Sequence, residues 1–89
     1  SHDKDWSLAK KCEFVLSQNS HTLNTREIAE QIAREDPDFF APPPMDIARL
    51  QKNIGSVLFQ KVADKKIFFR EAIGKELRYG LLRTREIMK

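Results

Sequence analysis

Cysteine and histidine are scarce in this chain of 89 residues. The single cysteine, Cys12, excludes a disulfide within the chain and leaves no thiol pair for zinc; it is more simply a small buried apolar residue than a reactive thiol. Of the two histidines, His2 resembles a cloning remnant, as does Ser1, so His21 has no partner for an acid–base pair or a metal site. We therefore expect no enzyme, no metal, no cofactor and no small-molecule substrate.

Long apolar runs are missing as well. No run approaches the ~20 residues of a membrane-spanning helix, and the chain does not open with the charged and apolar segments of a secretory leader. With the lone cysteine, this predicts no membrane partner and an intracellular location in a reducing compartment, which is the nucleus of a eukaryote or the cytoplasm of a bacterium.

What is present is the composition of one globular domain. Hydrophobic residues make up 40% and charged residues 33% of the chain, which separates it from disordered tails. A chain of this length buries roughly 60–65% of its unfolded surface, so its core must be small and well patterned. We assign residues 6–83 to the domain, residues 1–5 to a cloning remnant and disordered N-terminus, and residues 84–89 to a tail or linker to a larger protein.

Charge divides the chain into two halves. Residues 1–44 carry 5 Lys or Arg against 8 Asp or Glu, a net charge of −3, whereas residues 45–89 carry 11 against 5, a net charge of +6. A basic surface that meets a partner therefore lies in the C-terminal half.

Two amphipathic helices are predicted in the N-terminal half. The segment "DWSLAKKCEFVLSQN" places small and branched apolar residues on one helical face. In "LNTREIAEQIARED", Asn24 caps the helix with Glu27 as its capping-box partner, Leu23 and Ile28 occupy the hydrophobic-staple positions, and Pro37 ends it. The predicted stripes are Leu8, Ala9, Cys12, Val15 and Leu16, and then Ile28, Ala29, Ile32 and Ala33.

A third helix, from about Pro44 or Asp46 to about Ala63, has the clearest period. Its apolar side contains Ile47, Leu50, Ile54, Val57, Leu58 and Val62. Its polar side contains Arg49, Lys52, Asn53, Ser56 and Gln60, with no acidic residue among them. Such a face suits the base edges of DNA, since Arg pairs with guanine and Asn with adenine, but it also fits a solvated surface.

A β-hairpin follows the third helix. "KIFFRE" and "ELRYGLL" are rich in strand-forming residues and are separated by "AIGK", in which Gly74 favours a turn. Of Phe68 and Phe69, one faces the core and the other the opposite side. The residues expected to contact phosphates are Lys61, Lys65, Lys66, Arg70, Lys75 and Arg78.

Three helices followed by a basic hairpin predict a winged helix-turn-helix of the α+β class, with "HTL" before the second helix as a small third strand. The predicted core is Leu16, Ile28, Ile32, Leu50, Ile54, Val57, Leu58, Phe68 and Leu81. The segments "FVL", "LNTREIAEQIA", "ARLQKNIGSVL", "IFFR" and "RYGLL" also resemble the HARE helix-turn-helix family over about residues 6–82. The resemblance implies a DNA-binding adaptor domain of a larger chromatin, transcription or restriction-type protein.

Two functions remain open at this point. In the first, the third helix reads double-stranded DNA in the major groove and the hairpin contacts phosphates. In the second, exposed aromatic residues dock another protein or another domain of the same chain, because winged helix folds serve both purposes. The aromatic residues concerned are Trp6, Phe14, Phe39 and Phe40.

Overall fold

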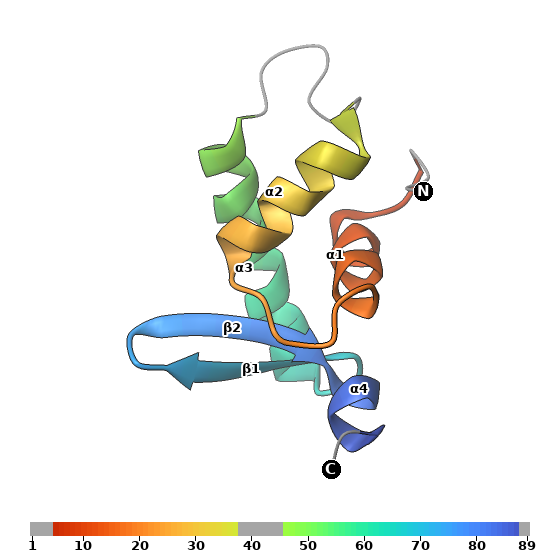
Figure 1. Cartoon of the computed structure of the whole chain (residues 1–89), viewed down its shortest axis with the longest axis vertical. Helices are drawn as coiled ribbons and strands as arrows, with labels where there is room; N and C mark the ends of the chain where they lie inside the picture. Colours follow the sequence, from red (N-terminus) through yellow and green to blue (C-terminus); the bar gives the residue numbers. More distant parts are fainter. Residues whose placement is uncertain (1–4, 38–45, 88–89) are drawn as a thin grey trace.

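The structure, a computed structural model, describes residues 5–37 and 46–87, with side chains up to Thr84. Three helices are followed by an antiparallel hairpin that packs on them, which confirms the predicted fold class (Figure 1). The elements are α1 (Leu8–Ser17), α2 (Thr25–Glu35), α3 (Ile47–Asp64), β1 (Phe68–Ile73), β2 (Glu76–Leu81) and α4 (Leu82–Ile87). Helix α4 continues directly from β2, so part of the expected C-terminal tail is helical.

The predicted start and end of α2 are confirmed. The Asn24 side chain accepts from the Glu27 amide at 2.8 Å, and the Glu27 carboxylate accepts from the Asn24 amide at 3.0 Å. Leu23 and Ile28 are both buried, as a hydrophobic staple requires. The helix ends at Glu35, and the next residue leaves the helical region in front of Pro37.

Helix α1 buries part of its predicted stripe, with Leu8 and Ala9 only half-buried, and it buries one polar residue that was not predicted. Cys12, Val15 and Leu16 lie in the core, and Lys11 beside them is only 1% exposed. The Lys11 ammonium lies 2.6 Å from the carboxylate of Asp36, the C-cap of α2. This ion pair joins the middle of α1 to the end of α2, and the sequence pattern did not predict it.

Helix α3 begins at Ile47, directly after its N-cap residue Asp46. The Asp46 side chain accepts from the Arg49 amide at 2.7 Å, and the helix runs for 18 residues to Asp64. Its C-cap, Lys65, has a φ of 57°, in the left-handed region that non-glycine residues adopt at a cost. The alternative start at Pro44 lies outside the described residues.

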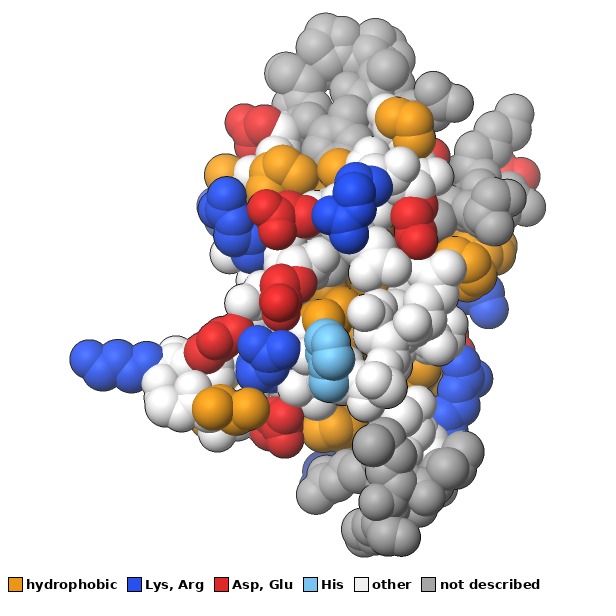
Figure 2. Space-filling model, in the orientation of Figure 1, with side chains coloured by type: hydrophobic (Ala, Val, Ile, Leu, Met, Phe, Trp, Pro, Cys, Tyr) orange, Lys and Arg blue, Asp and Glu red, His pale blue; other side chains and the backbone are white. Residues whose placement is uncertain are grey.

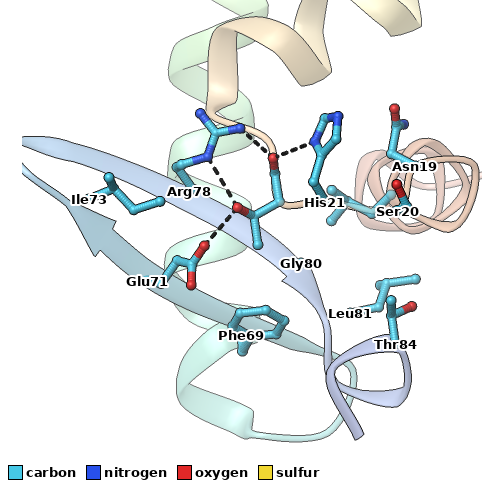
Figure 3. Close-up of a pocket in the computed structure, with 12 residues that line it drawn as sticks. Asn19, Ser20, His21, Phe69, Glu71, Ile73, Arg78, Gly80, Leu81 and Thr84 are labelled. Carbon is cyan, nitrogen blue, oxygen red and sulfur yellow. Dashed lines mark hydrogen bonds between the residues drawn. The ribbon is translucent and has the colours of Figure 1, made fainter. Parts of the chain in front are cut away.

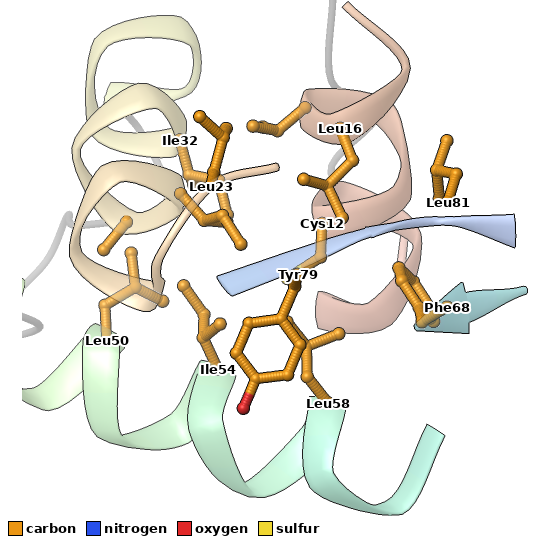
Figure 4. Packing of buried hydrophobic residues seen from close by; sticks show 13 residues of the cluster. Cys12, Leu16, Leu23, Ile32, Leu50, Ile54, Leu58, Phe68, Tyr79 and Leu81 are labelled. Carbon is orange, nitrogen blue, oxygen red and sulfur yellow. The ribbon is translucent and has the colours of Figure 1, made fainter. Parts of the chain in front are cut away.

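The core lies where the three helices and the hairpin meet (Figure 4). All predicted core residues are buried except Val57, which is only half-buried at the margin of the α3 stripe. The observed core also contains residues that the prediction left out. The buried cluster is Cys12, Val15, Leu16, Leu23, Ile28, Ala29, Ile32, Leu50, Ile54, Leu58, Phe68, Tyr79 and Leu81.

The hairpin, which we call the wing, pairs Phe68 with Leu81 at one end and Ile73 with Glu76 at the other. Gly74, in the turn between the two strands, has a φ of 63°, which glycine adopts without a Cβ clash. Phe68 is buried and Phe69 faces the opposite side, as predicted, although Phe69 is itself half-buried.

One backbone bridge fastens the wing to the rest of the fold, and one close contact holds its two strands together. The expected third strand is a single bridge, in which the Leu23 amide donates to Tyr79 at 2.9 Å and the Tyr79 amide donates back at 2.7 Å. Within the wing, the Phe69 ring on β1 covers Gly80 on β2 so closely that a Cβ there would lie 2.7 Å from the ring. The wing is thus held along the strand that leads back into the core.

Candidate nucleic-acid interface

The polar side of α3 points away from the core. Leu50, Ile54 and Leu58 are fully buried on one side of the helix, while every polar residue predicted for base reading is exposed on the other. Within residues 5–37 and 46–84, none of these polar side chains forms a hydrogen bond or an ion pair. We call this surface the outward face of α3; it comprises Arg49, Lys52, Asn53, Ser56 and Gln60.

Five of the six residues predicted to contact phosphates are exposed around this face. Lys61, Lys65 and Lys66 lie at the C-terminal end of α3 and in the connection to β1. Arg70 projects from β1, and Lys75 occupies the turn of the wing. The structure therefore places cations at the end of the helix, along the wing and at its tip. On the face shown in Figure 2, by contrast, acidic and basic side chains are interspersed.

Arg78, the sixth, is engaged inside the protein. Its Nε donates to the Thr22 hydroxyl at 3.1 Å, and one terminal nitrogen donates to the Thr22 carbonyl oxygen (Figure 3). That nitrogen also lies 3.4 Å from Glu27, and the other terminal nitrogen donates to Glu76 at 2.6 Å. Its side chain is 17% exposed. These contacts join the wing to the connection between α1 and α2, so we leave Arg78 out of the candidate interface.

Around Arg78, two more hydrogen bonds complete a network. The Thr22 hydroxyl donates to Glu71 at 2.8 Å, and the side-chain amide of Asn24 donates to Glu76 at 2.6 Å. The Asn24 hydrogen bond, and then the Arg78 charge, lower the pKa of Glu76 below its usual value. The ionised carboxylate is therefore the form that holds the network together.

A hollow of about 670 Å³ lies on the side of the wing away from α3. Phe69, Glu71 and Ile73 point into it from β1 (Figure 3), and Thr22 and Thr84 are also among the residues that line it. Arg70 lies on the other side of the same strand, because side chains alternate along a strand. The hollow is therefore separate from the outward face of α3.

Phe59, which was not among the predicted site residues, lies beside the outward face of α3. Its side chain is 63% exposed, and the Arg70 guanidinium lies over its ring, 5.7 Å from the centroid. An aromatic residue outside the apolar stripe of α3 was the available signal. Its pairing with a strand residue could not be read from the helical period.

The aromatic residues of the alternative interface are only partly described. Trp6 and Phe14 are half-buried and pack against each other, with ring centroids 5.3 Å apart, and the Lys10 ammonium lies 5.6 Å from the Trp6 ring. Phe39 and Phe40 lie outside the described residues. The two described aromatics thus cover the flank of α1.

Burial raises the pKa of the Cys12 thiol to about 12. The neutral thiol is a poor nucleophile, so Cys12 acts as a core residue.

None of the described helices has the length and apolarity to cross a bilayer. Comparisons of the chain with protein-family models, curated proteins and solved structures give no match, and the resemblance to the HARE family rests on the sequence pattern.

Proposed function

We propose that this domain binds duplex DNA, with the outward face of α3 in the major groove and the wing on the phosphate backbone. The observation that carries the proposal is the chemistry of that face. Its five polar side chains are exposed, have no partner in the described structure, and include no carboxylate. Phosphates repel carboxylates and water does not, so the absence of acids favours a polyanion as the partner.

The geometry fits the roles of the two groups of residues. A major groove about 12 Å wide admits one helix, and Arg49 and Asn53 can each form paired hydrogen bonds to a base edge. Lys61 in the last turn of α3 and Lys66 and Lys75 beyond the helix are exposed, so they can meet phosphates without reading sequence. In the HARE family such a domain would serve as an adaptor within a larger chromatin, transcription or restriction-type protein.

Fluorescence anisotropy with a labelled 20-base-pair duplex tests the proposal. We expect micromolar affinity at about 50 mM salt and a slope of log affinity against log salt of about −3 to −5, as for roughly four to six neutralised phosphates. Lys52→Glu should abolish binding, whereas Arg34→Glu, which makes the same charge change on the exposed surface of α2, should weaken it only slightly.

Two results would count against the proposal, the first against DNA binding and the second against the outward face of α3 as the interface. Absence of binding at about 50 mM salt would refute it directly. Equal loss from Lys52→Glu and Arg34→Glu would show that net charge, rather than the outward face of α3, determines the affinity.

A further inference from the structure

Gly55 has no structural explanation within the described part of the chain. It lies in the middle of α3, where glycine costs about 0.5–1 kcal/mol relative to alanine. A Cβ at this position would meet no atom within 4 Å, so no close packing requires glycine. The space that Gly55 leaves open lies on the outside of the helix.

Phe59 lies one turn further along α3, on the same side. Gly55 and Phe59 line an open hollow of about 500 Å³ together with Lys52, Ser56 and Gln60. We call it the α3 notch. Bare backbone at Gly55 forms its floor, and the exposed ring of Phe59 forms an apolar wall.

The rim of the notch is polar and positively charged. Lys52 belongs to its lining, and Arg70 reaches across from β1 to lie over the Phe59 ring. No carboxylate lines the notch. The notch thus suits a small apolar group that is carried next to negative charge.

Duplex DNA presents one such group in its major groove, the C5-methyl of thymine, which lies a short distance from the phosphate backbone. We propose that the α3 notch receives a thymine methyl group, with Phe59 as a specificity-determining residue and Gly55 allowing the base edge to approach the helix backbone. Arg70, held against the ring, then meets a neighbouring phosphate. This inference rests on the proposed DNA binding and adds to it a preference for thymine.

Removal of the methyl group alone tests the inference. The probes are two 20-base-pair duplexes, one of alternating adenine and thymine and one with deoxyuridine in place of every thymine. The unaltered domain should bind the uracil duplex about fourfold more weakly, the factor expected for burial of one methyl group. Phe59→Ala should lose this factor, so that its ratio of affinities is about fourfold smaller than that of the unaltered domain. Comparing ratios of affinities cancels any difference in shape between the two duplexes, because that difference affects both proteins alike.

Two further variants separate the notch from general effects. Ile67→Ala removes another exposed apolar side chain, 42% exposed and outside α3, and should keep the fourfold ratio. Gly55→Ala should raise the melting temperature, because alanine favours the helix, and should reduce the ratio, because its methyl group fills the floor of the notch.

The outcomes distinguish the inference from the proposed function. If the unaltered domain binds neither duplex, DNA binding itself fails. If it binds both equally, or if Phe59→Ala keeps the fourfold ratio, DNA binding stands and the thymine site is refuted. A Gly55→Ala domain with the full ratio would refute the close approach to the helix backbone.

Discussion

The buried ion pair between Lys11 and Asp36 makes an asymmetric prediction about stability. The Lys11 side chain is 1% exposed and the Asp36 side chain 15% exposed, with 2.6 Å between ammonium and carboxylate. Breaking a buried pair costs about 3–5 kcal/mol when a charge stays behind in the core. Asp36→Ala removes one carboxylate from an ammonium that stays buried, so we expect it to cost about 3 kcal/mol. Lys11→Met, which replaces the cation with an apolar chain of similar length, should cost about 1 kcal/mol or less.

Urea denaturation of both single variants and of the double variant measures these values. Lys11→Met should suppress most of the effect of Asp36→Ala, so the double variant should be more stable than Asp36→Ala alone. Arg26→Ala is a suitable control, because its 3.5 Å pair with Glu30 is exposed and is expected to contribute about 0.5 kcal/mol or less. Equal losses from Asp36→Ala and Lys11→Met would refute the reasoning, since they would mean that the buried ammonium costs no more without Asp36 than the Asp36 carboxylate costs without Lys11.

Three more predictions follow from the packing and from the proposed interface. Leu58→Ala should lower the free energy of unfolding by about 2–5 kcal/mol in the same urea assay, because Leu58 is fully buried; a loss below about 1 kcal/mol would contradict the orientation of α3. Gly80→Ala should destabilise by about 1–3 kcal/mol, because the new Cβ would lie 2.7 Å from the Phe69 ring; an unchanged melting temperature would show that the ring moves away freely. In anisotropy titrations against several duplexes, Asn53→Ala should reduce the differences among sequences, whereas Lys75→Ala should weaken all of them alike and reduce the salt slope by about 1; identical behaviour of the two variants would leave α3 as a phosphate contact only.

Local signals made most of the fold predictable. The cap at Asn24 depends on Glu27 three residues later, and the turn of the wing depends on Gly74, so both lie within a few residues of sequence. The buried side of α3 repeats every three or four residues, and Leu50, Ile54 and Leu58 are buried as that period predicts.

The remaining features depend on residues far apart in the chain. Lys11 is buried because Asp36 lies against it after α1 and α2 pack, and no pattern within α1 contains that information. In the sequence, Arg78 and Lys75 are both basic residues of the wing. Only the folded structure distinguishes them, because it brings Thr22, 56 residues earlier, to within hydrogen-bond distance of Arg78. The sequence therefore predicted the candidate site as one face of a helix. It did not predict which of the basic residues near that face already bind other residues of the protein.

The fastening of the wing has a consequence for experiments that shorten the chain. A two-stranded hairpin on its own is marginally stable in water, and this one is tied to residues 22–27 by the Leu23–Tyr79 bridge and the Arg78 network. Deleting the first 24 residues would therefore release the wing at the other end of the sequence, along with α1. If such a truncated protein lost DNA binding, that result would not show that the N-terminal segment contacts DNA. Point substitutions, which leave the wing in place, are therefore the sound way to map the interface.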